Sequence, residues 1–312
     1  MRSAPTLGDG PPLAPRTLLA APGVVLERPR RLFDKLLPVD STVLVALDGS
    51  KNAEKVLPVV LPLLQKGTGR ALFLQVLPPG AEAPEAAAQA YLKEISARFS
   101  SRGIRSDAEI VHGDPAVAIV RAAEKEMAGL VAFTSHGQGG LSQWVFGSVA
   151  QKILRGCSRP LLIVRALETP AERVRKILVP LDGALGSEAI LPHALELARA
   201  YPAPVELLHV LSESGVEAGD SKLRSWIGRE KKRMDARFAE IEKAARDVTF
   251  THVFLEGDAA TRIVERVDAE PSSIVAMANH GRTGFSRWIY GSVCEKILQG
   301  ARCPVLIARP PS

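Results

Sequence analysis

A glycine-rich segment occurs twice in this chain of 312 residues, each time with the same internal spacing. The first copy runs from His136 to Ser148 and the second from His280 to Ser292. Both ends are offset by 144 residues, since 280 − 136 and 292 − 148 both equal 144. This period far exceeds the roughly 20 to 50 residues of a solenoid repeat, so each copy is expected to fold around its own core.

The duplication extends well beyond this segment. Residues 43–49 resemble residues 177–183, and residues 160–165 resemble residues 304–309. The sequence therefore predicts two tandem domains, at residues 41–166 and 174–309. Residues 1–40 stand outside the repeat and contain seven prolines and scattered arginines, which is typical of a flexible arm.

Composition excludes several classes of protein. The net charge of +6 is spread thinly, without a basic run interleaved with aromatic residues, so nucleic acid is not an expected partner. No stretch approaches the roughly 18 apolar residues of a membrane span, so a membrane is not expected either. Cys157, Cys294 and Cys303 do not match between the copies, which predicts neither disulfides nor a metal site. A reducing compartment, the cytoplasm, is therefore expected.

Short aliphatic runs alternate with helical patterns in both copies, which predicts an α/β fold of two doubly wound domains with helices on both faces of parallel sheets. The runs expected as strands in the first copy are 43–47, 72–77, 130–133 and 161–164. Those in the second copy are 177–181, 205–211, 249–254, 274–277 and 305–308. The charged segment 220–246 is expected to form one long, solvent-facing helix.

The order of strands predicts where a ligand binds. Right-handed crossovers place the first three strands of each domain on one side and return the fourth to the other side of the first. Ligands of open α/β sheets bind beyond the carboxyl ends of the strands at this reversal. Asp48 and the segment from His136 lie there in the first copy, and Asp182 and the segment from His280 are their counterparts.

The repeated segment has the composition of a phosphate-binding loop. Glycines let a backbone approach a ligand with its N–H groups pointing inward, and a helix start adds unpaired N–H donors. The residues expected to contribute are Gly137, Gly147 and Ser148 in the first copy and Gly281, Arg282, Gly291 and Ser292 in the second. The alternative is a structural βα turn in which the serine is an N-cap.

Four aspartates are expected at the ends of strands. Asp48 and Asp182 follow the first strands, where a carboxylate can bind a ribose or an adenine edge, and Asp-Gly is equally a turn signal. Asp114 and Asp258 follow a glycine and precede a helical pattern, which predicts N-caps.

These motifs resemble the universal stress protein family. The family's nucleotide motif is a glycine, two residues, a glycine, nine residues and a glycine followed by Ser or Thr. Gly137 with Gly147-Ser148, and Gly281 with Gly291-Ser292, match its last two glycines and the hydroxyl residue. The resemblance covers residues 41–309 and implies a five-stranded parallel sheet in each domain, in the order 3-2-1-4-5. It also implies that the final strands of the two domains pair across a pseudo-twofold axis, and it leaves a further homodimer open.

The same resemblance implies ATP, held by the aspartate after strand one, the end of strand two and the glycine-rich loop. Carried over by position, the first site comprises Asp48, Val76, Gly137, Gly147 and Ser148, and the second comprises Asp182, Val210, Gly281, Gly291 and Ser292. Mg²⁺ is implied only as a companion of the phosphates, since the sequence contains no dedicated carboxylate cage.

One departure from the motif separates the two sites. Its first glycine is replaced by Thr134 in the first copy and by Ala278 in the second. If that position requires a positive φ, a side chain costs on the order of 1 kcal/mol or more, and β-branched Thr costs more than Ala. Arg282 adds a cation where the first copy has Gln138. ATP is therefore expected to favour the second repeat.

The expected function is that of a cytoplasmic stress-response protein that binds ATP or a related adenine nucleotide in one or both repeats and regulates unidentified protein partners. Two alternatives stay open. A nucleotide-free scaffold is suggested by Thr134 and Ala278, and slow ATP hydrolysis is known among related α/β domains. No catalytic residue is predicted, because there is no P-loop and neither His136 nor His280 has a carboxylate or nucleophile in its own loop.

Overall fold

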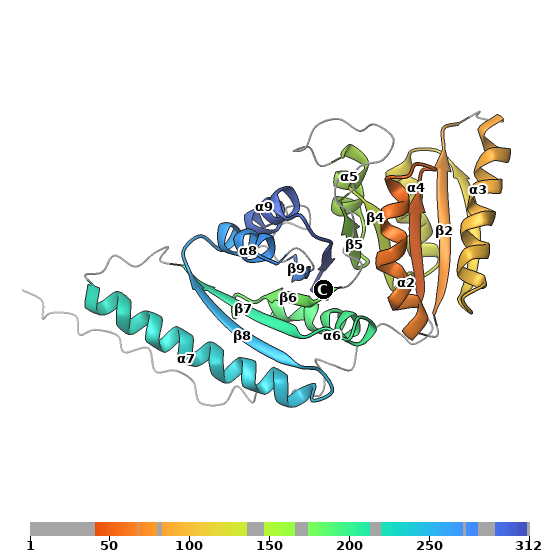
Figure 1. The fold of residues 1–312 in the computed structure, drawn as a ribbon. Coiled ribbons are helices and arrows are strands. Elements are labelled where there is room, and N and C mark those ends of the chain that lie inside the picture. The colour runs from red at the N-terminus through yellow and green to blue at the C-terminus, as the bar shows by residue number, and fades with distance from the viewer. Residues whose placement is uncertain are drawn as a thin grey trace, which may run out of the picture.

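The computed structural model describes residues 41–67, 69–79, 83–135, 147–165, 174–212, 220–270, 273–279 and 291–310. Ten strands in these residues form one sheet, in the order β3-β2-β1-β4-β5-β10-β9-β6-β7-β8 (Figure 1). Each half is a parallel five-stranded sheet in the order 3-2-1-4-5, which confirms the prediction. The predicted arm, residues 1–40, lies outside the described residues.

The first half alternates strands with helices throughout. Its strands are β1 (Thr42–Leu47), β2 (Arg70–Leu77), β3 (Arg105–His112), β4 (Leu130–Thr134) and β5 (Leu161–Val164). Its helices are the 3-10 turn η1 (Ala53–Val56), α2 (Leu57–Lys66), α3 (Ala83–Ser100), α4 (Pro115–Lys125) and α5 (Ser148–Gly156).

The second half repeats this order. Its strands are β6 (Lys176–Pro180), β7 (Val205–Leu211), β8 (Phe250–Glu256), β9 (Ser273–Ala278) and β10 (Val305–Ala308). Its helices are the 3-10 turn η2 (Ser187–Ile190), α6 (Leu191–Ala200), α7 (Asp220–Ala244), α8 (Ala259–Asp268) and α9 (Ser292–Gly300).

Helices cover both faces of the sheet. One apolar cluster packs α2, α3, α6 and α7 against one face, and a second packs α4, α5, α8 and α9 against the other. Central strands are covered on both sides, which is why all six residues of β1 are buried and its sequence is continuously apolar from Val43 to Leu47. Edge strand β3 is mostly exposed or half-buried, so it lacks such a run and the sequence predicts no range for it.

The two halves join through their final strands. β5 and β10 pair antiparallel, with Leu162 opposite Leu306, which confirms the predicted pseudo-twofold pairing. Both of these leucines belong to one apolar cluster that continues through the two halves. The ten strands therefore form a single sheet with a continuous core on each face.

Helix α7 extends along the outer strands β7 and β8 of the second half (Figure 1). Its bounds agree closely with the predicted segment 220–246, but it does not face solvent throughout. Met234, Phe238 and Ile241 are fully buried. Their spacing of four and three residues forms the apolar stripe of an amphipathic helix.

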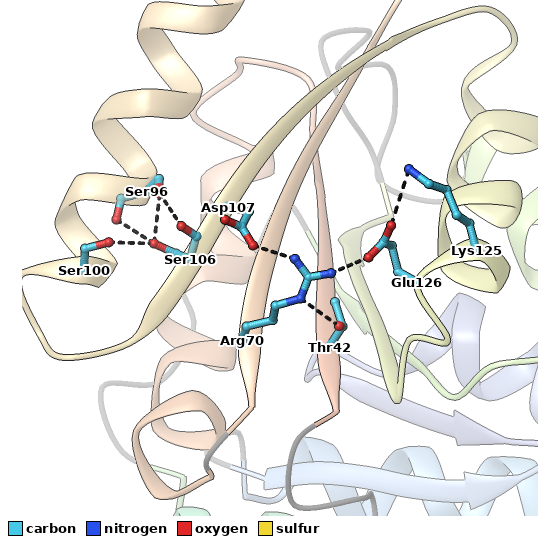
Figure 2. Close-up of polar contacts among 8 residues, drawn as sticks. All are labelled: Thr42, Arg70, Ser96, Ser100, Ser106, Asp107, Lys125 and Glu126. Carbon is cyan, nitrogen blue, oxygen red and sulfur yellow. Dashed lines mark hydrogen bonds and ion pairs between the residues drawn. The ribbon is translucent and has the colours of Figure 1, made fainter.

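A charged cluster fastens the amino end of the first half of the sheet (Figure 2). Arg70, the first residue of β2, donates from Nε to Thr42 Oγ1 at 3.2 Å and from Nη1 to Asp107 Oδ2 at 2.5 Å, and it also pairs with Glu126. Lys125 lies 3.4 Å from the same Glu126 carboxylate. The cluster connects β1, β2, β3 and the end of α4 at the edge opposite the predicted ligand site, so its role is structural.

Candidate functional site

The topology brings four predicted site residues of the first half to one edge of the sheet. Strands β2, β1 and β4 are neighbours, so their carboxyl ends lie side by side. Asp48 directly follows β1, and Val76 is the penultimate residue of β2. Gly147 is the N-cap of α5, and Ser148 is its first residue. The backbone N–H of Gly147 donates to the oxygen of Ser135, just beyond β4, at 3.1 Å. This bond attaches the start of α5 to the strand ends.

The second half places its counterparts in the same way. Val210 is the penultimate residue of β7, and Asp182 lies two residues beyond β6. Helix α9 begins with Gly291 and Ser292, and the N–H of Gly291 donates to Oδ1 of Asn279 at 3.5 Å. The remaining predicted residues, Gly137, Gly281 and Arg282, lie outside the described residues.

Glycine is required where α5 begins. A Cβ on Gly147 would lie 2.7 Å from the backbone oxygen of Ser135, which is closer than two such atoms can approach. Gly147 itself occupies the N-cap position, and Gly291 does so in the second half. The interpretation of the following serines as N-caps is therefore wrong. Ser148 and Ser292 are the first helical residues, and both are exposed.

The two Asp-Gly pairs form matching turns. Oδ1 of Asp48 accepts from the N–H of Ser50 at 2.9 Å, and Oδ1 of Asp182 accepts from the N–H of Ala184 at 2.9 Å. Gly49 and Gly183 both have φ of +81°, which explains the glycine. The structural interpretation of these aspartates is thus confirmed. It is compatible with ligand binding, because an ionised carboxylate has about four acceptor sites.

The replaced glycine of the motif does not strain the backbone. Thr134 ends β4 and Ala278 ends β9, and neither is among the described residues with a positive φ. An extended conformation accepts a side chain without penalty. Thr134 and Ala278 therefore do not oppose ligand binding through backbone strain.

The predicted caps of α4 and α8 are confirmed, and each is linked to the next helix. Asp114 accepts from the N–H of Val117 at 3.1 Å, and Lys152 of α5 donates to it at 2.9 Å. The hydrogen bond from Lys152 is the main reason that the pKa of Asp114 is lowered. In the second half Asp258 caps α8, and Lys296 of α9 lies 3.7 Å away. These pairs connect α4 to α5 and α8 to α9.

A polar position on the second strand of each half, directly before Val76 and Val210, was not predicted from the sequence. Gln75 is 8% exposed, and its Oε1 has no hydrogen-bond partner among the described residues. Its counterpart is His209, whose Nδ1 lies 2.7 Å from the oxygen of Leu181. A carbonyl only accepts, so Nδ1 carries the proton.

A second missed feature reaches the site from α7. Nε and Nη2 of Arg233 bond Glu230 at 3.0 and 2.5 Å, and Nη1 lies 3.4 Å from the oxygen of Gly183. Glu230 in turn lies 3.6 Å from Nε2 of His209. The bonds to Glu230 are the main reason that the pKa of Arg233 is raised. Only the folded arrangement of β6, β7 and α7 brings these residues together, so no sequence motif marks them.

Metal ligands, membrane spans and cysteines in the described ranges bear on other kinds of site. No cluster of three or more His, Cys, Asp or Glu side chains there is suited to hold a metal ion. Within those same ranges no helix is long and apolar enough to cross a membrane. The three cysteines are free thiols and buried. Burial raises the pKa of the Cys294 and Cys303 thiols to about 12.

Comparison with known proteins identifies relatives by sequence. Universal stress protein MJ0531 of Methanocaldococcus jannaschii is 31% identical over 143 residues, covering 44% of this chain and 83% of that protein. Universal stress protein Rv2005c of Mycobacterium tuberculosis is 26% identical over 215 residues, covering 67% of this chain and 71% of that protein.

One solved structure shares the fold over most of this chain, and another matches it in part. A universal stress protein from Archaeoglobus fulgidus, 19% identical, matches with a TM-score of 0.65 and covers 86% of this chain and 98% of its own. Another universal stress protein, solved in complex with cAMP, is 23% identical and covers 41% of this chain and 98% of its own, with a TM-score of 0.35.

The family model agrees with the duplication. The model of the universal stress protein family matches this chain twice, at residues 41–165 and 173–309. The chain therefore belongs to the universal stress protein family and contains two tandem domains of it.

Proposed function

We propose that this protein is a cytoplasmic stress-response module that binds ATP or a related adenine nucleotide at the carboxyl edge of its sheet and regulates protein partners. The observation that carries the proposal is the paired arrangement at that edge. In each half a helix starts with Gly-Ser beside the end of the fourth strand, next to the aspartate that follows the first strand. Helix starts bind phosphates, and carboxylates bind ribose hydroxyls.

Both repeats are candidates for the ligand, and the second is favoured. Arg282 supplies a cation in the second repeat, where the first repeat has Gln138. Mg²⁺ enters with the phosphates of the nucleotide. The residues proposed to bind are Asp48, Val76, Gly137, Gly147 and Ser148 in the first repeat and Asp182, Val210, Gly281, Arg282, Gly291 and Ser292 in the second.

A thermal scan with and without ATP·Mg²⁺ tests the proposal. Ligand at 100 times its dissociation constant should stabilise the folded protein by about 2.7 kcal/mol, which raises the melting temperature. Gly137→Val and Gly281→Val, separately and together, should reduce the shift stepwise. Gly228→Val, at an exposed position of α7 where an added Cβ has open space among the described residues, should leave the shift intact. An unchanged melting temperature at millimolar nucleotide would eliminate nucleotide binding and favour the scaffold function.

A further inference from the structure

Each half of the chain ends in an arginine that reaches the other half. Arg165 follows β5 and Arg309 follows β10, and they are equivalent because 309 − 165 equals the repeat offset of 144. Nη1 of Arg165 donates to the backbone oxygen of Ala301 at 2.9 Å. Nη2 of Arg309 donates to the backbone oxygens of Leu154 and Arg155 at 2.9 and 2.8 Å.

The acceptors are carbonyl groups at the carboxyl ends of α5 and α9. Leu154 and Arg155 lie in the last turn of α5, and Ala301 is the C-cap of α9. The last four carbonyls of an α-helix have no partner inside the helix, and the helix dipole concentrates partial negative charge there. A guanidinium group donates charge-assisted hydrogen bonds to these carbonyls, and its positive charge lies beside the negative end of the dipole.

The opposite ends of these two helices begin the candidate phosphate sites. Helix α5 starts at Ser148 and has nine residues, and α9 starts at Ser292 and also has nine. At about 1.5 Å per residue, each is a rod of only about 13 Å. The last turn, which the arginine contacts, therefore lies within about two helical turns of the first turn at the phosphate site.

Each arginine is also attached to the site of its own half. The N–H of Ser135 donates to the oxygen of Val164 at 2.8 Å, and the N–H of Asn279 donates to the oxygen of Ala308 at 2.8 Å. Val164 and Ala308 directly precede Arg165 and Arg309. The arginines thus connect the strand end beside one site to the helix that begins the other site.

We propose that Arg309 positions the phosphate-binding helix of the first repeat and that Arg165 positions that of the second. Each nucleotide site is then completed by the other half of the chain, which makes the two sites interdependent. The assignment of a ligand rests on the proposed function, whereas the effect on the helices does not. The alternative is that both arginines only join the halves, which would affect both helices alike.

Hydrogen exchange of the full chain without ligand tests the helix effect on its own. Arg309→Ala should speed amide exchange in α5 about threefold to tenfold and leave α9 unchanged. Arg165→Ala should do the reverse, so each variant is the matched control of the other. Arg309→Lys and Arg165→Lys keep the charge and should restore much of the protection. Faster exchange in both helices with either variant, or in neither, would overturn the proposal.

ATP·Mg²⁺ titrations then test the sites one at a time. In a Gly281→Val background, which silences the second site, Arg309→Ala should weaken binding about threefold to tenfold and Arg165→Ala should not. In a Gly137→Val background the pattern should invert. Equal losses from both arginine variants would refute positioning across the halves. If the parent chain binds no nucleotide, the proposed function fails, and the exchange pattern still decides whether the arginines position the helices.

Discussion

Arg237 on α7 holds the buried carboxylate of Glu188 with two parallel hydrogen bonds, from Nε to Oε1 at 2.6 Å and from Nη2 to Oε2 at 2.5 Å. Only 4% of the Glu188 side chain is exposed, against 28% for Arg237. These bonds are the main reason that the pKa of Arg237 is raised. The pair fixes α7, which also carries Arg233, to the turn η2 that follows Asp182.

Removing one partner of this pair should destabilise the protein markedly. Arg237→Ala leaves Glu188 buried and unpaired, which should lower the free energy of unfolding by about 2 to 4 kcal/mol in urea denaturation. The double variant Glu188→Leu with Arg237→Met should recover most of that loss. The matched pair in the first half, Glu54 and Arg98, is 3.6 Å apart with Arg98 half exposed, so Arg98→Ala should cost less than about 1 kcal/mol. Equal losses in the two halves would refute the importance of burial.

Helix α5 offers a sharp test of the glycine at its start. In Gly147→Ala the new methyl group would collide with the backbone oxygen of Ser135, so stability should fall by about 1 to 3 kcal/mol. Gly156→Ala, at the other end of the same helix, meets Val120 at 3.7 Å, which is ordinary contact. That control should be neutral or stabilising by up to about 1 kcal/mol. Thermal melting distinguishes them, and a harmless Gly147→Ala would contradict the close approach.

His193 in α6 should make stability depend on pH. Its Nδ1 is buried without a hydrogen-bond partner among the described residues, and burial lowers the pKa of its imidazole to about 4. The unfolded chain, with an ordinary histidine pKa near 6.5, binds more protons between about pH 4 and pH 6.5. Stability should therefore fall as pH falls, by about 2 kcal/mol from pH 7 to pH 5, and stay level above pH 7.

His193→Val provides the control for this pH dependence. Val59 occupies the equivalent position in the first half, since 193 − 59 equals the offset of 134 between Asp48 and Asp182. Between pH 7 and pH 5 the free energy of unfolding of this variant should fall by about 2 kcal/mol less than that of the parent chain, as measured by urea denaturation. An unchanged pH profile would show that His193 is not the group responsible.

Much of the fold could be predicted from local patterns. The apolar runs from Val43 to Leu47 in β1 and from Leu161 to Val164 in β5 are typical of strands buried on both faces, and the two halves confirm each other through their repeat. The edge strand β3 could not be predicted, because its sequence is polar, with Arg105 and Asp107 at its start, and lacks such an apolar run. The buried stripe of α7 was not predicted, because charged residues dominate the composition of that helix.

The candidate site divides in the same way. Asp48 and Ser148 could be placed at one edge because strand order alone puts the ends of β1 and β4 side by side. The sequence could not place three other residues, because their contacts depend on how β7, α7 and the junction of the halves pack. These residues are His209, Arg233 and Arg309. The sequence also could not decide whether the position of Thr134 requires a positive φ, since only the backbone shows that it does not have one.

Isothermal titration of the full chain with ATP·Mg²⁺ tests the central claim most directly, with tripolyphosphate and GTP as comparison ligands. We predict saturable binding of ATP at up to two sites per chain, tighter in the second repeat, and loss of that tighter component in Gly281→Val. No saturable binding at millimolar ATP·Mg²⁺, by protein with normal circular dichroism and cooperative melting, would contradict it.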